Sequence, residues 1–149
     1  MKKQTVTPIT TPTVTIYAGA TFRRYWRRLA WPYPTKVVNN EVLQLDGTPA
    51  PEAERVLDDY TGCKVVAELR DSTTNALLFT WSTETGGVLI EGEYLGLELQ
   101  PEATNTLAAF ESAVAYVEVR RLDGDVERPF EVPFAYSASK TAAQPAEIV

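Results

Sequence analysis

Histidine and cysteine are the side chains that most often act as a general base, a metal ligand or a nucleophile near neutral pH, and this sequence nearly lacks both. It contains no histidine and one cysteine, Cys63. The missing histidines remove the usual proton acceptor and the commonest zinc ligand. One cysteine cannot form an internal disulfide. Cys63 also falls on the apolar face of an alternating segment, which favours a buried small hydrophobe over a nucleophile.

Carboxylates are the remaining candidates for acid–base or metal chemistry. Asp58-Asp59 and the pair Glu91 and Glu93 could share a proton, but no substrate-binding motif lies beside them, so solvated loop charges are favoured. Asp123-Gly124-Asp125-Val126-Glu127 has carboxylates at alternate positions, as calcium loops do. Asp-Gly is, however, a strong hairpin-turn signal, and no further oxygen ligands follow nearby. We therefore expect a protein that is not an enzyme and has no cofactor and no metal site.

The strongest local constellation is a run of basic and aromatic residues, Arg23-Arg24-Tyr25-Trp26-Arg27-Arg28, followed by Trp31 and Tyr33. Arg, Tyr and Trp are enriched at interface hot spots, which favours a protein-interaction surface built from these eight residues. One alternative is an edge strand whose rings fill the core and whose Arg side chains are solvated or paired. Another is a nucleic-acid groove in which the rings stack on bases.

Charge is divided unevenly along the chain. The first 40 residues carry seven basic side chains and no acidic one, whereas the remainder carries seven basic and all 20 acidic side chains; +7 and −13 combine to the net charge of −6. Such segregation is typical of an interaction surface. The acidic remainder would repel phosphates, so nucleic acid is an unlikely partner, and we expect an acidic protein surface or a neighbouring copy instead.

The size and composition indicate one domain. The chain has 149 residues, of which 44% are hydrophobic, enough for one core. Its apolar runs are far shorter than the roughly 20 residues that cross a bilayer. The basic start is followed by Thr and Pro where a signal peptide needs an apolar segment, so we expect a protein made in the cytoplasm without a secretion signal.

The elements that must position these residues read as short strands. Turn signals recur about every ten residues, and alternating segments such as Cys63–Arg70 and Val114–Leu122 lie between them. We predict an all-β, immunoglobulin-like antiparallel β-sandwich of about seven or eight strands with short helical turns; a Greek-key barrel is the competing architecture. Thr21–Trp31 is predicted as one long strand, with a bulge or at an edge. Val126–Tyr136 is predicted at a sheet edge because Pro129 and Pro133 lack N–H groups.

The predicted organisation has three parts. Residues 1–13 form an extended N-terminal arm, residues 14–136 form the β-sandwich, and residues 137–149 form an extended C-terminal tail. The sandwich carries an irregular insertion at residues 32–57. Within it we expect a small hairpin with Asn39-Asn40 at its turn, and a short helix over Pro51–Leu57.

From Thr21 to Tyr136, the order of segments resembles the immunoglobulin-like N-terminal domain of phage baseplate upper proteins and its relatives in tail and fibre proteins. The matching pieces are Gly19-Ala20-Thr21-Phe22, the strand Tyr60–Ser72, Leu78-Phe79-Thr80-Trp81 with Gly86–Ile90, Leu97–Thr104, and the hairpin Tyr116–Arg128 with its Asp-Gly turn. The insertion at residues 32–57 is longer than the family's usual connection, and the Arg pairs replace mostly apolar or hydroxyl positions.

The resemblance implies a non-enzymatic structural protein of the bacteriophage virion. Such a protein would join tail, baseplate or fibre components through protein–protein contacts, in several copies or as a homo-oligomer. One alternative is a capsid decoration or head-fibre protein. Another is a carbohydrate-binding module that contacts the host surface through exposed aromatic side chains such as Trp31 and Tyr33; a carbohydrate-processing enzyme is a more distant alternative.

Overall fold

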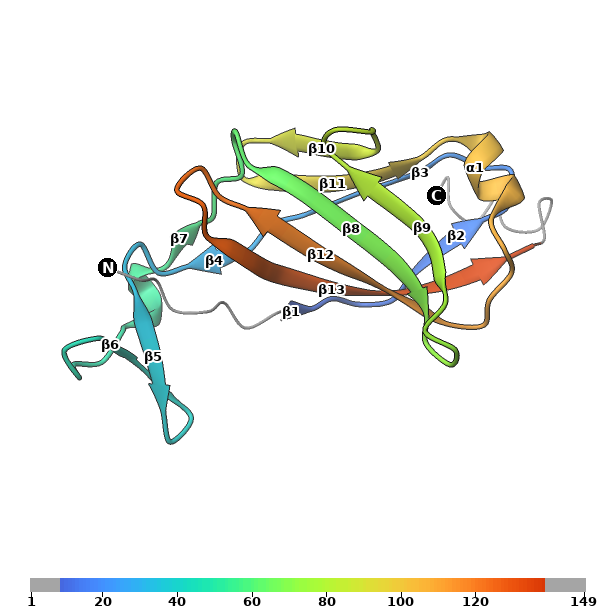
Figure 1. Cartoon of the computed structure of the whole chain (residues 1–149). Helices are drawn as coiled ribbons and strands as arrows, with labels where there is room; N and C mark the ends of the chain where they lie inside the picture. Colours follow the sequence, from blue (N-terminus) through green and yellow to red (C-terminus); the bar gives the residue numbers. More distant parts are fainter. Residues whose placement is uncertain (1–8, 139–149) are drawn as a thin grey trace.

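The computed structural model describes residues 9–138 and contains two packed β-sheets (Figure 1). In sheet order, the larger one consists of β1 (Ile9–Thr10) and β2 (Val14–Tyr17) at one edge, then β13 (Val126–Ser137), β12 (Ala113–Arg120), β8 (Lys64–Asp71) and β9 (Leu77–Ser82). The smaller one consists of β10 (Val88–Glu91), β11 (Tyr94–Leu99) and β3 (Phe22–Trp26). The predicted all-β sandwich is confirmed, and two separate sheets replace the alternative of a barrel.

The core lies between the two sheets and follows the alternation of the strands. Val65, Ala67 and Leu69 of β8 are fully buried, because every second residue of a strand faces the same side. Trp81 of β9 is also fully buried, and its indole Nε1 donates a hydrogen bond to the Glu98 carbonyl at 3.0 Å. This bond joins the larger sheet to the smaller one. Cys63 is buried just before β8, as the sequence predicted.

Strand β13 is an interior strand, so the prediction that its prolines place it at an edge is wrong. It pairs antiparallel with β12 and parallel with β1 and β2. The pairing with β1 reaches Glu131 and resumes with β2 at Phe134, so Pro133 lies in the gap between these two short strands. Pro129 lies where the register with β12 shifts. The two missing N–H groups therefore fall where the ladders are interrupted.

The predicted single strand over Thr21–Trp31 is divided in two. Strand β3 ends at Trp26 on the edge of the smaller sheet, and β4 (Leu29–Ala30) leaves the sandwich to pair with β7 (Val56–Leu57). The predicted edge position of the basic segment is confirmed for β3. The continuous strand is wrong because the chain changes its pairing partner after Trp26.

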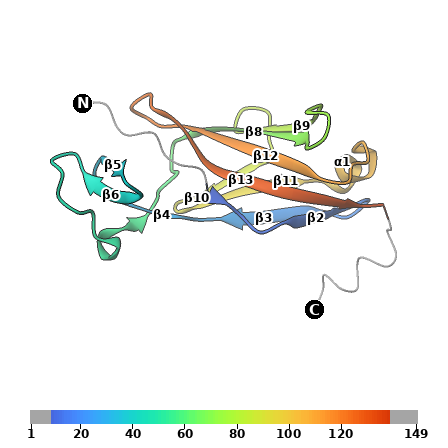
Figure 2. The same ribbon diagram turned by 90° about the horizontal axis from the view of Figure 1, so that it is seen from below.

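Residues 29–57 form a lobe beyond the end of both sheets, as two perpendicular views show (Figures 1 and 2). It contains β4, β7, the hairpin of β5 (Thr35–Val38) and β6 (Glu41–Gln44), and the 3₁₀ turn η1 (Glu52–Glu54). Asn39 and Asn40 have φ values of 50° and 64°, which confirms the predicted hairpin turn. The helix expected over Pro51–Leu57 is only this short 3₁₀ turn, followed by β7. No lobe residue belongs to the buried core cluster of the sandwich.

The limits of the sandwich differ slightly from the predicted ones. Residues 1–8 of the expected N-terminal arm lie outside the described residues, and β1 already pairs with β13, so the sandwich includes Ile9. At the other end β13 includes Ser137, and residues 139–149 lie outside the described range. The one α-helix of residues 9–138 is α1 (Pro101–Thr106), which begins at a proline as expected. None of the helices in this range is long and apolar enough to cross a bilayer.

Candidate functional site

The basic and aromatic residues of β3 are distributed over both faces of an edge strand. Phe22 is buried and Trp26 packs against the core, whereas Arg23 and Tyr25 lie on the outer face, because neighbouring residues of a strand point to opposite sides. Arg24 shares the inward side but is exposed. It can remain solvated because β3 is the edge strand of the smaller sheet, with no further strand beside it in that sheet.

Two of the four arginines are paired with acidic side chains on the neighbouring strand and turn. Arg23 lies opposite Glu98 of β11, and its guanidinium contacts that carboxylate through both Nε and Nη2. Arg27 contacts Glu93 at 3.7 Å and lies over the ring of Tyr94. Both charges are therefore compensated within the chain, which reduces the basic character expected of this segment.

Tyr25 covers a glycine on the outer face of the smaller sheet. A Cβ on Gly96 would lie 2.7 Å from the Tyr25 ring, so only glycine allows this close contact. The ring also meets Tyr94 edge-on, with the two centroids 6.4 Å apart. Desolvation, together with the carboxylate of Glu91, raises the pKa of the Tyr25 hydroxyl. Tyr25 and Tyr94 thus form a small aromatic surface beside Arg27.

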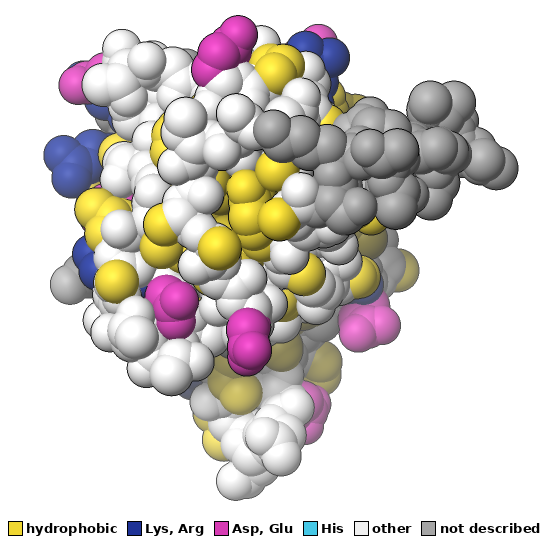
Figure 3. Space-filling view, turned by 90° about the vertical axis from the view of Figure 1, so that its right-hand side faces the viewer, with side chains coloured by type: hydrophobic (Ala, Val, Ile, Leu, Met, Phe, Trp, Pro, Cys, Tyr) yellow, Lys and Arg dark blue, Asp and Glu magenta, His cyan; other side chains and the backbone are white. Residues whose placement is uncertain are grey.

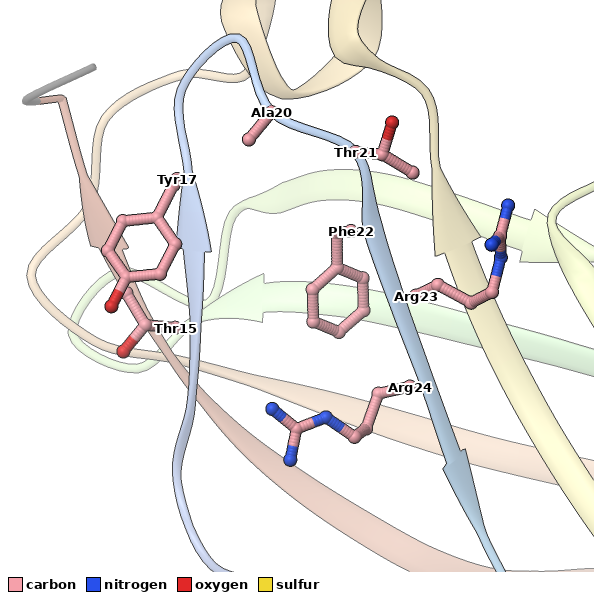
Figure 4. A pocket seen from close by; sticks show the side chains of 7 residues that line it. All are labelled: Thr15, Tyr17, Ala20, Thr21, Phe22, Arg23 and Arg24. Carbon is pink, nitrogen blue, oxygen red and sulfur yellow. The ribbon is translucent and has the colours of Figure 1, made fainter. Parts of the chain in front are cut away.

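Arg24 borders a shallow hollow between β2 and β3 (Figure 4). The hollow has a volume of about 100 Å³ and is lined by Thr15, Tyr17, Ala20, Thr21, Phe22, Arg23 and Arg24. Figure 4 shows Arg23 and Arg24 directed to opposite sides of β3. Among residues 9–138, the side chains of Arg24 and Arg28 have no ion pair or hydrogen bond, but two nitrogens of Arg28 are buried. Arg24 is exposed and therefore free to meet an external carboxylate.

Trp31 and Tyr33 are bound inside the lobe and are not presented as a free aromatic platform. The indole Nε1 of Trp31 donates to the Pro51 carbonyl at 2.8 Å, and Arg55 lies over its ring. The Tyr33 hydroxyl donates to Glu54 at 2.5 Å. This bond raises the pKa of Tyr33 to about 12, because the neighbouring carboxylate disfavours a phenolate. The polar tips of both rings are therefore used to hold the lobe together.

Arg28 lies at the base of the lobe, beside a cluster that sequence reasoning did not identify. The Arg28 carbonyl accepts a hydrogen bond from the Asp58 N–H at 3.0 Å, which closes the two ends of the lobe against each other. Arg121 of the β12–β13 turn contacts the Asp58 carboxylate at 2.6 Å and Glu127 at 2.8 Å. Burial alone would lower the pKa of Arg121, but these hydrogen bonds raise it above its ordinary value.

The lobe also carries exposed apolar side chains that the sequence analysis did not single out. Five large hydrophobic residues of the lobe are at least 43% exposed, namely Leu29, Val37, Val38, Leu45 and Val56. Val37 and Val38 precede the predicted Asn39-Asn40 turn and could have been noted there, but nothing in the sequence shows that the lobe leaves the sandwich.

At the end of the molecule away from the lobe, basic side chains do not gather into a single surface. Seen from that end, Lys and Arg side chains are scattered among Asp and Glu (Figure 3).

Asp123-Gly124-Asp125 forms the hairpin turn between β12 and β13, with Gly124 at a φ of 92°. Within residues 9–138, no three His, Cys, Asp or Glu side chains are grouped as a metal site would require.

No family model matches the chain, and no curated protein is significantly similar to it.

Proposed function

We propose that this protein is a non-enzymatic structural component of a bacteriophage particle that joins tail, baseplate or fibre parts through protein–protein contacts. The observation that supports this role best is the lobe of residues 29–57, which projects from the sandwich with exposed apolar side chains and no share in its core. A projecting, apolar and well-anchored element is suited to enter a groove on a neighbouring protein. The resemblance of residues 21–136 to the baseplate family agrees with this role.

The lobe is firmly held at its base and is not a loosely tethered loop, which supports a role in attachment. Strands β4 and β7 pair at Ala30 and Val56, and the Arg28–Asp58 hydrogen bond lies next to that pair. Arg121 then ties Asp58 to Glu127 of β13. A rigid base lowers the entropy lost when the lobe binds, because the lobe is already held in one orientation.

The same contacts weigh against the other binding functions. A nucleic-acid groove needs several uncompensated cations along one strand, but Arg23 and Arg27 are paired with Glu98 and Glu93. A glycan platform needs exposed ring faces on which sugars stack, but Arg55 lies over the Trp31 ring and the Tyr33 hydroxyl is bonded to Glu54 within the lobe. Neither alternative is favoured by a specific observation.

The proposal is tested by removing the lobe and leaving the sandwich intact. Because Ala30 and Val56 are paired partners, residues 31–55 can be replaced by a two-residue Asn-Gly turn. We expect the variant to fold with the circular dichroism of a β-sandwich and to be absent from assembled particles, in which the full chain is found. An intact chain that never copurifies with particles, or a lobeless variant that is incorporated normally, would contradict the proposal.

A further inference from the structure

The outer edge of β5, in the lobe, faces no other strand in the part of the chain that the structure describes. Strand β6 is covered on its outer side, since the Ala50 N–H donates to the Val42 carbonyl and the Gln44 N–H donates to the Thr48 carbonyl. Among residues 9–138, β5 pairs with β6 alone. Its sequence, Thr35–Val38, is short and carries one charged residue, Lys36. It has no proline and no bulge, two of the features that commonly protect an edge strand.

The hydrogen-bonding groups that face this open edge can be identified from β6. Val42 and Gln44 use their backbone groups on the side away from β5. Their partners across the hairpin are Val37 and Thr35. In an antiparallel pair, residues directly opposite each other turn their N–H and C=O groups either both inward or both outward. Val37 and Thr35 therefore direct these groups to the free edge.

We propose that two copies of this chain associate through their β5 edges, as an antiparallel strand pair in which Val37 lies opposite Val37 of the second copy. The partner is a second copy because the edge is complementary to itself under a two-fold axis perpendicular to the hairpin. This inference deepens the proposed joining function and rests on it, since it names one of the contacts that the lobe makes.

Only one register satisfies the symmetry and the charges. A two-fold axis keeps each side chain on its own face, so the axis must pass beside a single residue. Axes beside Lys36 or Val37, the two central residues of β5, keep the most overlap between the two strands. Centring on Lys36 would place two like charges directly opposite each other, which is destabilising. Centring on Val37 instead makes a hydrogen-bonded pair, because the groups of Val37 already face outward.

The Val37 register also gives favourable neighbours on both faces. On one face, the pairing of Val37 with Val42 continues across the axis as a row of four valines. On the other face, Lys36 lies opposite Val38 of the second copy, and Val38 is paired with Glu41. Lys36 and the second copy's Glu41 are then two strand spacings apart, about 10 Å between Cα atoms, which two extended side chains can bridge.

The free edge of β3 is less suited to the same association. It carries Arg23 and Arg24, with Arg27 just beyond its end, and pairing two copies there would bring like charges together. By contrast, Val37 and Val38 are 54% and 45% exposed, so the β5 edge offers apolar surface that only a partner would bury.

The test is the concentration dependence of self-association of the full chain, measured by sedimentation equilibrium. A single strand pair is a small interface, so we expect a dimer with a dissociation constant on the order of 10 µM or higher. Val37→Lys should weaken it about tenfold or more, because two lysines would lie opposite each other. Val56→Lys is the matched control, as Val56 is 50% exposed on β7 away from this edge, and should leave the dimer unchanged.

Cysteine cross-linking tests the register. In the Val37 register, Cα atoms of the two residues 37 are about 5.5 Å apart, within the range of a disulfide. Oxidation of Val37→Cys should therefore yield a covalent dimer quickly, and Lys36→Cys slowly. The native Cys63 is buried and serves as background. Circular dichroism checks that each variant folds.

Three results would overturn the inference. The chain stays monomeric up to millimolar concentration, or Val56→Lys weakens the dimer as much as Val37→Lys does, or cross-linking is faster at residue 36 than at residue 37. These outcomes are separate from those of the particle assay. A monomeric chain that is still incorporated into particles would refute the β5 pairing but not the joining function. A dimer that is never found in particles would refute the joining function but not the β5 pairing.

Discussion

Arg121 holds Asp58 at 2.6 Å although 63 residues separate them in the sequence. The contact fixes the end of the lobe to the turn between β12 and β13, and a second contact to Glu127 at 2.8 Å places the guanidinium between two carboxylates. All three side chains are at most 14% exposed. This largely buried cation therefore helps, with the β4–β7 pair and the backbone hydrogen bond between Asp58 and Arg28, to orient the lobe relative to the sandwich.

Replacing Arg121 with Met should destabilise the domain strongly. The variant leaves the carboxylates of Asp58 and Glu127 in a largely buried site without their cation, and removing one partner of a buried pair costs about 3–5 kcal/mol. The free energy of unfolding in urea measures the loss. Arg128→Met is the control: Arg128 is 66% exposed and 3.7 Å from Glu118, so its change should stay within about 0.5 kcal/mol. Equal effects of the two variants would contradict the proposed anchoring role.

Two glycines with similar backbone conformations should respond differently to alanine. Gly87 and Gly124 have φ values of 88° and 92°, so alanine strains the backbone at both, by about 1–2 kcal/mol. At Gly124 the new Cβ meets open space, whereas at Gly87 it would lie 2.7 Å from the Trp81 ring. Because overpacking adds about 1–3 kcal/mol, Gly87→Ala should be clearly the less stable variant in thermal unfolding. A similar melting temperature for both would show that Trp81 moves at little cost.

The hydroxyl of Tyr33 should lose its proton at a higher pH than an ordinary tyrosine, and this raised pKa should depend on the carboxylate of Glu54. Its pKa is raised from 10.0 to about 12, chiefly by its hydrogen bond to Glu54. A pKa raised in the folded state means that this bond stabilises the lobe fully below pH 10 and is lost as the pH rises from 10 to 12. In NMR titrations of ¹³C-labelled tyrosine, Glu54→Gln should return Tyr33 towards pH 10. Glu52→Gln, on the same turn, should leave the titration of Tyr33 at about pH 12.

Charge reversal should separate the structural arginine of β3 from the free one. Arg23→Glu would place a carboxylate opposite Glu98, which is 16% exposed, and should cost about 1 kcal/mol or more of stability. Arg24→Glu should change stability by no more than about 0.5 kcal/mol, because Arg24 is exposed and without an ion pair among the described residues. If Arg24 meets an acidic surface in the particle, Arg24→Glu reduces incorporation while unfolding curves stay unchanged. Normal incorporation would exclude Arg24 from the interface.

Local patterns predicted much of the fold. Alternation identified the buried face of β8, including Val65 and Leu69, because burial on a strand repeats every second residue. Asn39-Asn40 and Asp123-Gly124 predicted their hairpin turns, since these residues tolerate positive φ. Local rules were less reliable for β13, where Pro133 indicated an edge but lies in a gap between two partner strands.

The candidate site was predicted as a set of residue types, but not as a surface. The sequence marked Arg23, Arg27 and Trp31, yet each partner is distant in the chain: Glu98, Glu93 and Pro51. Ion pairing and burial depend on which segments the sheets bring together, and no local spacing encodes that.

What the sequence by itself determined is the local conformation: where strands alternate, where turns fall, and that histidine chemistry is absent. The tertiary structure alone decided that residues 29–57 leave the sandwich, that Arg121 anchors their base, and that no strand of residues 9–138 covers the outer edge of β5. The physical reason is the distance along the chain over which each kind of interaction acts. Backbone preferences act over a few residues, whereas charge compensation, burial and strand edges are set by contacts between segments far apart in the chain.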